Sequence, residues 1–412
     1  MERGETIVKN DKIKFICAIV VFYLLIFQDF LQNKIHLFHY FDEALAFSVF
    51  PLAIYLIFYK KESIFKKTIN KIFYGLFTLV FLIGFVSTLV YHIQPFGIAL
   101  SDMIVFSKFF FAYSISELLI SEDFVSKYRR EICLNVRIVA AILFVSTILN
   151  YIFKIWSITD YRYGIMCNQL FYSRPTILAG VCIFLIALLM ATSKDVYEKY
   201  FVILISLVLM STLRFKAIAA ALVALLIIIY VKKTKKKISL WKILLLGLVA
   251  IVIGWSQIKF YFIQIESARK VLNQTSVKIA NDYFPLGSGF GTFACHFSNV
   301  HYSRLYYDYN ISNVHGLSPN GKDFFFSDVF WPMILGQFGW FGLVVYVSLI
   351  AIIFKKIQDD YSPENINIYL AKMICLVYLL ISSTSESAFV HYIAVPLALV
   401  IGINSNKKKD SR

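Results

Sequence analysis

The sequence predicts an all-α polytopic membrane protein, because of its composition and the length of its apolar segments. Of the 412 residues, 59% are hydrophobic and 17% are aromatic, and the mean hydropathy is +0.70. Soluble domains rarely have such values, whereas repeated apolar runs of about 20 residues are typical of membrane-spanning helices. About twelve runs fit this length rule, at roughly 13–31, 44–59, 72–91, 98–119, 132–153, 175–192, 200–213, 215–231, 240–258, 329–354, 367–384 and 387–403.

These runs divide the chain into three parts. Residues 1–258 contain the first nine predicted helices, residues 259–327 form one large extracytoplasmic loop between helices 9 and 10, and residues 328–412 contain helices 10–12 and a cytoplasmic tail. With both termini in the cytoplasm, 28 of the 41 Lys and Arg residues lie on the inner side, and the other 13 lie on the outer side or in the outer halves of helices. Such an inner excess is typical of membrane proteins. The net charge of +16 is therefore interpreted as a topology signal near anionic lipid, and nucleic acid is not an expected partner.

Two long loops are predicted on the outer side. The first runs from Lys154 to Arg174, and the second begins with residues 261–283, whose apolar side chains recur at helical spacing. This spacing predicts an amphipathic helix that lies against the membrane surface. The rest of the second loop is irregular and aromatic. Loops of this length in a compact protein are more often functional than idle.

Cations near the outer ends of the predicted helices are candidates for binding an anion such as a diphosphate. Arg214 and Lys216 lie between two apolar runs, where a charge is costly unless it faces a cavity or a partner. Arg offers a planar fork of donors, and Lys offers a point charge. The alternative is a simple turn with snorkelling side chains. Further candidates, with interfacial contacts to lipid phosphate as the alternative, are Arg269, Lys270, Arg162 and Arg174.

Glycines and aromatic residues of the second loop are candidates for contacting a substrate. Gly287, Gly289 and Gly291 form the sequence GSGFG, which would permit close approach of a substrate or simply a tight turn. Tyr302 and Tyr306 belong to a run of flat amphipathic rings that would stack on sugar faces. An aromatic belt at the membrane interface is an equally good explanation of those rings.

One carboxylate stands out at the end of the second loop. Asp328 begins the tenth predicted helix, where it either caps the helix or acts as a general base towards a hydroxyl group. Glu386 has a similar status in the last outer turn, and His315 and His301 are substitute bases. No Cys/His spacing or acidic pair typical of a metal site and no nucleotide-binding motif occurs, so neither a metal nor a cofactor is expected.

Three motifs in this order resemble a known family. They are LRFK at 213–216, FPLGSGFGTF at 284–293 preceded by Arg269, and DVFWPMILGQFGWFG at 328–342. They resemble an arginine turn, a glycine-rich turn and a glycine-containing helix of the bacterial O-antigen polymerase/ligase family, specifically repeat-unit polymerases of the Wzy type. The likeness covers residues 200–355. It departs from the family's pattern at Asp328, which stands where the ligases have a catalytic His, and at Gln337, where Glu is common.

The resemblance implies an inverting, metal-independent glycosyltransferase in a bacterial plasma membrane. Its donor and acceptor would be undecaprenyl-diphosphate-linked oligosaccharides, and a chain-length regulator and a flippase would be its protein partners. Asp328 would deprotonate the acceptor hydroxyl, while Arg214, Lys216 and Arg269 would stabilise the departing diphosphate. Two alternatives remain open from the sequence: a ligase that passes the glycan to another acceptor, and a flippase or transporter.

Overall fold

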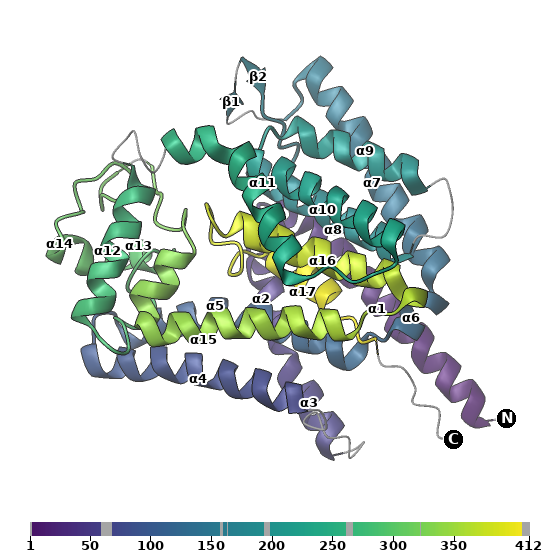
Figure 1. Cartoon of the computed structure of the whole chain (residues 1–412), viewed down its shortest axis with the longest axis horizontal. Coiled ribbons are helices and arrows are strands. Elements are labelled where there is room, and N and C mark those ends of the chain that lie inside the picture. The colour runs from purple at the N-terminus through teal and green to yellow at the C-terminus, as the bar shows by residue number, and fades with distance from the viewer. Residues whose placement is uncertain are drawn as a thin grey trace.

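The computed structural model describes residues 2–58, 68–156, 160–162, 164–192, 198–260, 267–321 and 323–405, and within them the chain is almost entirely helical (Figure 1). A short antiparallel hairpin pairs Tyr161 with Met166. In chain order the elements are α1 (Glu2–Gln32), η1 (His36–Tyr40), α2 (Phe41–Phe47), α3 (Val49–Phe58), α4 (Thr68–Tyr91), α5 (Phe96–Leu119), α6 (Glu122–Lys127), α7 (Arg129–Phe153), β1 (Tyr161–Arg162), β2 (Ile165–Met166), α8 (Pro175–Thr192), α9 (Glu198–Ser211), α10 (Phe215–Thr234), α11 (Leu240–Ile258), α12 (Ala268–Asp282), α13 (Phe297–Val300), α14 (Leu305–Asp308), α15 (Trp331–Asp359), η3 (Pro363–Asn365), α16 (Ile366–Ser382) and α17 (Ala394–Ile401).

Nine helical segments in the described ranges are long and apolar enough to cross a membrane. They confirm the predicted all-α polytopic class, but the predicted count of twelve is not confirmed. The run at 200–213 is the 14-residue helix α9, and the run at 387–403 contains only the 8-residue helix α17. At about 1.5 Å per residue, neither matches a hydrocarbon core of about 30 Å. Helix α11 also falls outside the nine, and some of its side chains lie outside the described residues.

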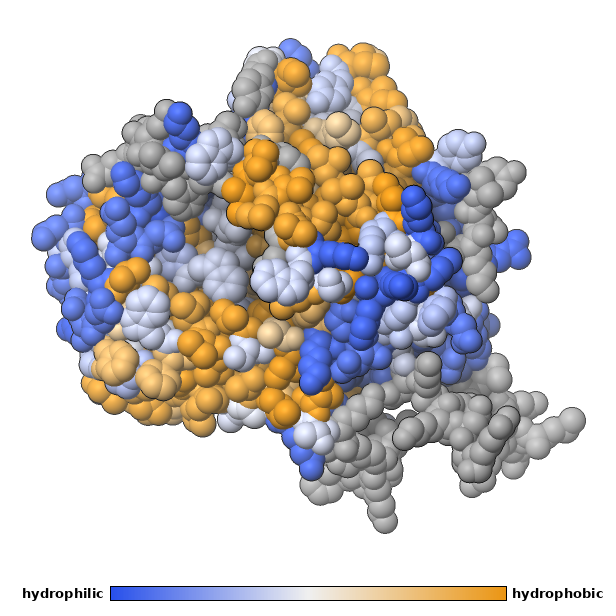
Figure 2. Space-filling model, viewed as in Figure 1, coloured by the Kyte–Doolittle hydropathy of each residue, from blue (hydrophilic) through white to orange (hydrophobic). Residues whose placement is uncertain are grey.

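Two helices form the centre of the bundle. In α8 and α16, 83% and 78% of the residues in the most apolar stretch are buried inside the protein. These two helices pack against each other, and α10 and α17 also pack against α16. A helix that is apolar on every side is expected in such a central position. Figure 2 shows the complementary arrangement on the surface, where a hydrophobic region over the middle of the bundle lies between hydrophilic residues at its two ends.

The connections between helices gather at the two opposite ends of the bundle (Figure 1). One end, called the basic end here, contains α6, the lysine run 232–237 and residues 359–365. Lys127 of α6 pairs with Asp11 of α1 at 2.7 Å, and Tyr361 donates a hydrogen bond to the carbonyl of Lys235. The other end, called the loop end, contains residues 160–162, 164–174, 211–216, 267–321, 323–330 and 383–393. The predicted inner and outer segments that are described therefore separate to different ends.

The amphipathic helix that the sequence predicts at 261–283 corresponds to helix α12, which covers most of that range. Residues 261–266 lie outside the described residues. Ser267 caps the helix, because its hydroxyl accepts a hydrogen bond from the backbone of Lys270. The apolar face of α12, which includes Leu272 and Ile279, is buried. It packs against α15, and Trp340 of α15 donates to Asn281 at 2.9 Å. The buried face thus covers protein, which differs from the prediction that the membrane surface would cover it.

Candidate anion-binding and catalytic site

Seven charged side chains converge at the loop end and are called the charged cluster. They come from the loop before α8, the first turns of α10 and α12, the segment before α15 and the turn between α16 and α17. Three carboxylates each bind at least one cation within 4 Å. The members are Asp160, Arg162, Arg214, Lys216, Arg269, Asp328 and Glu386. Most of the predicted anion-binding cations are therefore neighbours in space, although 107 residues separate Arg162 from Arg269 in the sequence.

Asp328 binds Arg269. Nη2 of Arg269 lies 2.9 Å from Oδ2 of Asp328, and the two side chains are 22% and 27% exposed. Arg269 is fixed in the first turn of α12 by the Ser267 cap. Asp328 lies three residues before Trp331, the first residue of α15; the capping position of that helix is Phe330, and no side chain caps it. The interpretation of Asp328 as a helix cap is therefore wrong, because its carboxylate is turned towards Arg269.

Lys216 connects this pair to a second carboxylate. Its Nζ lies 2.5 Å from Oε2 of Glu386, and the ammonium also interacts electrostatically with Arg269 and Asp328. The position of Glu386 depends on the next residue. Ser387 bonds to the carbonyl of Ser327 through both its backbone N–H, at 3.1 Å, and its hydroxyl, at 2.8 Å. These bonds hold the turn that carries Glu386 against the segment that carries Asp328.

The third carboxylate, Asp160, binds two arginines. Its Oδ2 lies 3.1 Å from Arg214 and 3.5 Å from Arg162. The Arg214 side chain is only 17% exposed, and its buried Nε has no hydrogen-bond partner within the described residues. Burial and the charge of Arg162 lower the pKa of the Arg214 guanidinium, while Asp160 and Glu386 act in the opposite direction. Because arginine stays protonated in proteins, a buried positive charge with a spare donor remains here.

This arrangement is suited to binding a multiply charged anion. Four cations surround three carboxylates, and guanidinium groups bind phosphate through pairs of parallel hydrogen bonds. The described residues contain no group of three or more His, Cys, Asp or Glu side chains that would hold a metal ion. The chemistry that these side chains offer is therefore stabilisation of an anion, next to carboxylates that can accept a proton.

Two predicted cations do not join the charged cluster through an ion pair. Among the described residues, neither Lys270 nor Arg174 lies within ion-pair distance of a carboxylate. Arg174 is exposed at the start of α8, and its neighbour Ser173 binds Asp29 at 3.0 Å. Their substrate-binding roles remain predictions.

The three glycines of GSGFG are buried and pack against protein. All have positive φ angles, of 79°, 93° and 74°. A Cβ atom on Gly287 would lie 2.3 Å from the backbone nitrogen of Gly339, where α15 is kinked. One on Gly289 would lie 2.8 Å from the backbone of Thr88 in α4. The close approach that Gly287 and Gly289 permit is made by α15 and α4, so the predicted contact with a substrate is wrong for these two and the tight-turn alternative holds. Gly291 lies at ordinary contact distance from Ile98 of α5.

The aromatic and histidine candidates of the second loop also have other partners. Tyr306 is fully buried, and its hydroxyl accepts from the backbone of Ala294 at 3.0 Å. Tyr302 donates to the carbonyl of Leu317 at 2.7 Å and packs against Tyr306. These two rings stabilise the loop, which corrects the prediction that Tyr306 stacks on a sugar. His315 is 78% exposed and pairs with Asp323 at 3.3 Å, so its partner lies outside the charged cluster.

Two members of the site were missed by sequence reasoning. Asp160, which pairs with two arginines, was not singled out, and neither was Ser387, which positions Glu386. A lone Asp two residues before Arg162 in an outer loop is a weak signal for the first. No sequence signal indicates the second, since the function of Ser387 depends on a contact with Ser327 that lies 60 residues away.

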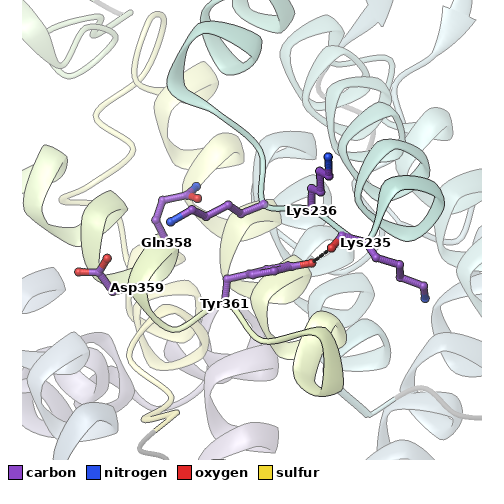
Figure 3. Close-up of a pocket in the computed structure, with 6 residues that line it drawn as sticks. Lys235, Lys236, Gln358, Asp359 and Tyr361 are labelled. Carbon is purple, nitrogen blue, oxygen red and sulfur yellow. Dashed lines mark hydrogen bonds between the residues drawn. The ribbon is translucent and has the colours of Figure 1, made fainter.

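Two hollows lie outside the charged cluster. A hollow of about 510 Å³ at the basic end is lined by Lys235, Lys236, Lys237, Gln358, Asp359 and Tyr361. Figure 3 shows that the side chains of Lys235 and Lys236 point in different directions, so their charges do not converge on one point. A hollow of about 310 Å³ at the loop end is lined by aromatic and polar residues, which include Phe30, Trp156, Gln169, Phe171 and Ser173.

The comparisons with known proteins do not identify a family for this chain. No protein-family model matches the sequence, and no curated protein matches it.

Proposed function

We propose that this protein is a polysaccharide polymerase that joins undecaprenyl-diphosphate-linked repeat units at the outer face of a bacterial plasma membrane. The observation that carries the proposal is the charged cluster at one end of an apolar helical bundle. Its four cations would bind a diphosphate at the membrane boundary, and its carboxylates would accept a proton. A lipid-linked sugar diphosphate presents its diphosphate at that boundary.

The proposed reaction is an inverting glycosyl transfer. The hydroxyl oxygen of the acceptor forms a bond to the anomeric carbon of the donor, on the side opposite the diphosphate. The bond between that carbon and the diphosphate oxygen breaks, and undecaprenyl diphosphate leaves. Asp328 receives the proton of the hydroxyl group. Arg214, Lys216 and Arg269 stabilise the negative charge that grows on the diphosphate in the transition state. The proposal includes no metal ion and no cofactor.

The aromatic hollow at the loop end supports a sugar substrate. Trp156 and Phe171 pack edge to face, with their ring centroids 6.1 Å apart, and Phe30 is exposed beside them. Flat amphipathic rings next to amide and hydroxyl groups, here Gln169 and Ser173, offer both stacking and hydrogen bonding. The loop between α7 and α8 contributes to this hollow and also carries Asp160 and Arg162 of the charged cluster.

The proposal requires the loop end to face outwards and the basic end to face the cytoplasm. In a cysteine-free variant, Asn313→Cys should react with a membrane-impermeant thiol reagent in intact cells, because Asn313 is exposed in the second loop. Ser239→Cys, exposed just after the lysine run, should react only after the membrane is opened. This labelling pattern is expected because the excess of cations at the basic end places that end in the cytoplasm. The reverse pattern of labelling would invert the topology and exclude an extracytoplasmic reaction.

Loss of the protein should leave lipid-linked or surface-linked single repeat units and no longer chains, because only the joining step is missing. The measurement is the length distribution of the polysaccharide after deletion, with complementation by the wild-type chain as the control. Full-length chains that accumulate on the lipid carrier without reaching their final acceptor would indicate a ligase. A single repeat unit trapped on the cytoplasmic side would indicate a flippase.

A further inference from the structure

The carboxylates of the charged cluster occupy the same cations that the proposed function assigns to diphosphate binding. Asp328 binds Arg269 at 2.9 Å, Glu386 binds Lys216 at 2.5 Å, and Asp160 binds Arg214 at 3.1 Å. Each carboxylate comes from a different segment of the chain. The protein without substrate therefore carries an internal anion on each of these three cations.

A diphosphate that bound here would meet three cations that already hold a carboxylate. The donors of a guanidinium lie in one plane, so a phosphate oxygen that approaches the donor facing a carboxylate competes with that carboxylate. Two anions on one cation also repel each other. A carboxylate oxygen that accepts a hydrogen bond from Arg269 is, for its part, occupied and poorly placed to take a proton from a substrate hydroxyl. If the diphosphate replaces the carboxylate on the cation, the diphosphate gains free donors and the carboxylate oxygen becomes free to take a proton.

We infer that diphosphate binding exchanges with these internal ion pairs, and that the exchange releases Asp328 to act as the base. The inference rests on the proposed function and adds an order to it: the diphosphate donor binds first, and only then does Asp328 accept the proton of the acceptor hydroxyl. Before the donor arrives, the base remains paired, so an acceptor alone meets an inactive site.

The backbone around the charged cluster is suited to an exchange that moves only side chains. Ser387 holds the turn of Glu386 to the carbonyl of Ser327, and Trp331 of α15 donates to Ser383 at 3.1 Å. The segments that carry Asp328 and Glu386 are thus fixed to each other. Arg269 and Lys216 lie on the first turns of separate helices. The carboxylates can rotate away from the cations while their positions along the backbone are kept.

The test measures binding of inorganic pyrophosphate to the purified full-length protein by calorimetry. The exchange predicts that Asp328→Asn binds pyrophosphate about three- to tenfold more tightly than the wild type, because a competing ion pair of ordinary strength is removed. Glu386→Gln should also bind more tightly, through Lys216. Arg269→Ala should bind more weakly. Asp282→Asn is the matched control, since this exposed carboxylate of α12 binds Tyr309 and no cation of the charged cluster, and its affinity should equal that of the wild type.

Unchanged or weaker binding by both Asp328→Asn and Glu386→Gln would overturn the exchange. The exchange would also be overturned if neither the wild type nor any variant bound pyrophosphate while the melting curve showed that the wild type was folded. If Asp328→Asn alone fails to fold, Glu386→Gln decides. The proposed function fails separately: tighter binding by the carboxylate variants together with no repeat-unit joining by the wild type would keep the exchange and reject the polymerase. Normal joining of repeat units by the wild type, without tighter binding by the carboxylate variants, would keep the polymerase and reject the exchange.

Discussion

Asp328→Asn is expected to lower the rate of chain extension by about 10²–10⁴-fold, the usual loss when a general base is removed. The substitution keeps the size of the side chain and its ability to accept a hydrogen bond from Arg269, but it removes the capacity to take a proton. The measurement is the turnover of a lipid-linked repeat unit by purified protein. Addition of a chelator in the same assay tests whether the reaction is independent of metal ions.

A helix-capping role of Asp328 does not complicate the result of this substitution, because the capping position of α15 is Phe330 and Asp328 does not cap the helix. The remaining structural function of Asp328 is its ion pair with Arg269. A purely structural contribution would appear as a lower melting temperature or a lower protein level, with the activity per folded molecule unchanged. Near-full activity of folded Asp328→Asn would exclude it as the base. Glu386, which lies in the same charged cluster, would then become the first candidate, before His301 and His315.

Arg214→Ala and Arg269→Ala are each expected to abolish chain extension while the protein level stays normal. A buried anion that loses a paired cation typically loses about 2–5 kcal/mol of interaction, which corresponds to roughly 30-fold to 4,000-fold in rate or affinity. Arg214→Lys should also be impaired, since an ammonium cannot reproduce the planar fork of donors. The unpartnered Nε of Arg214 within the described residues is the donor that a bound diphosphate would satisfy.

Arg304→Ala is the matched control for this second prediction. Arg304 is an exposed cation of the same loop, at the start of α14, and it is not a member of the charged cluster. Its removal changes the net charge of the protein by the same amount. Because no cation of the charged cluster is lost, the chain-length distribution should stay unchanged. Wild-type chain lengths in both Arg214→Ala and Arg269→Ala would remove these two residues from the mechanism, whereas equal defects in all three variants would indicate a nonspecific effect of charge.

Sequence reasoning was least successful where a residue's neighbours decide its function. GSGFG has the composition of a substrate-binding turn, but the backbone of α15 and α4 occupies the space beside Gly287 and Gly289. Tyr306 has the side chain of a sugar-stacking residue, but it is fully buried in the loop. A local pattern reports which backbone angles and which chemistry are available. It does not report whether solvent or another segment occupies the space beside them.

The sequence by itself determined the all-α membrane class, the two groups of loops and the amphipathic character of α12, because hydropathy and charge act on each segment separately. It also indicated the residue types that could bind a diphosphate. Only the tertiary structure decided that Arg214, Lys216 and Arg269 lie together, that each binds a carboxylate, and that Asp160 and Ser387 belong to the same site. The physical reason is that ion pairs act over a few ångströms in space, and packing of the helices brings together side chains that are far apart in the chain.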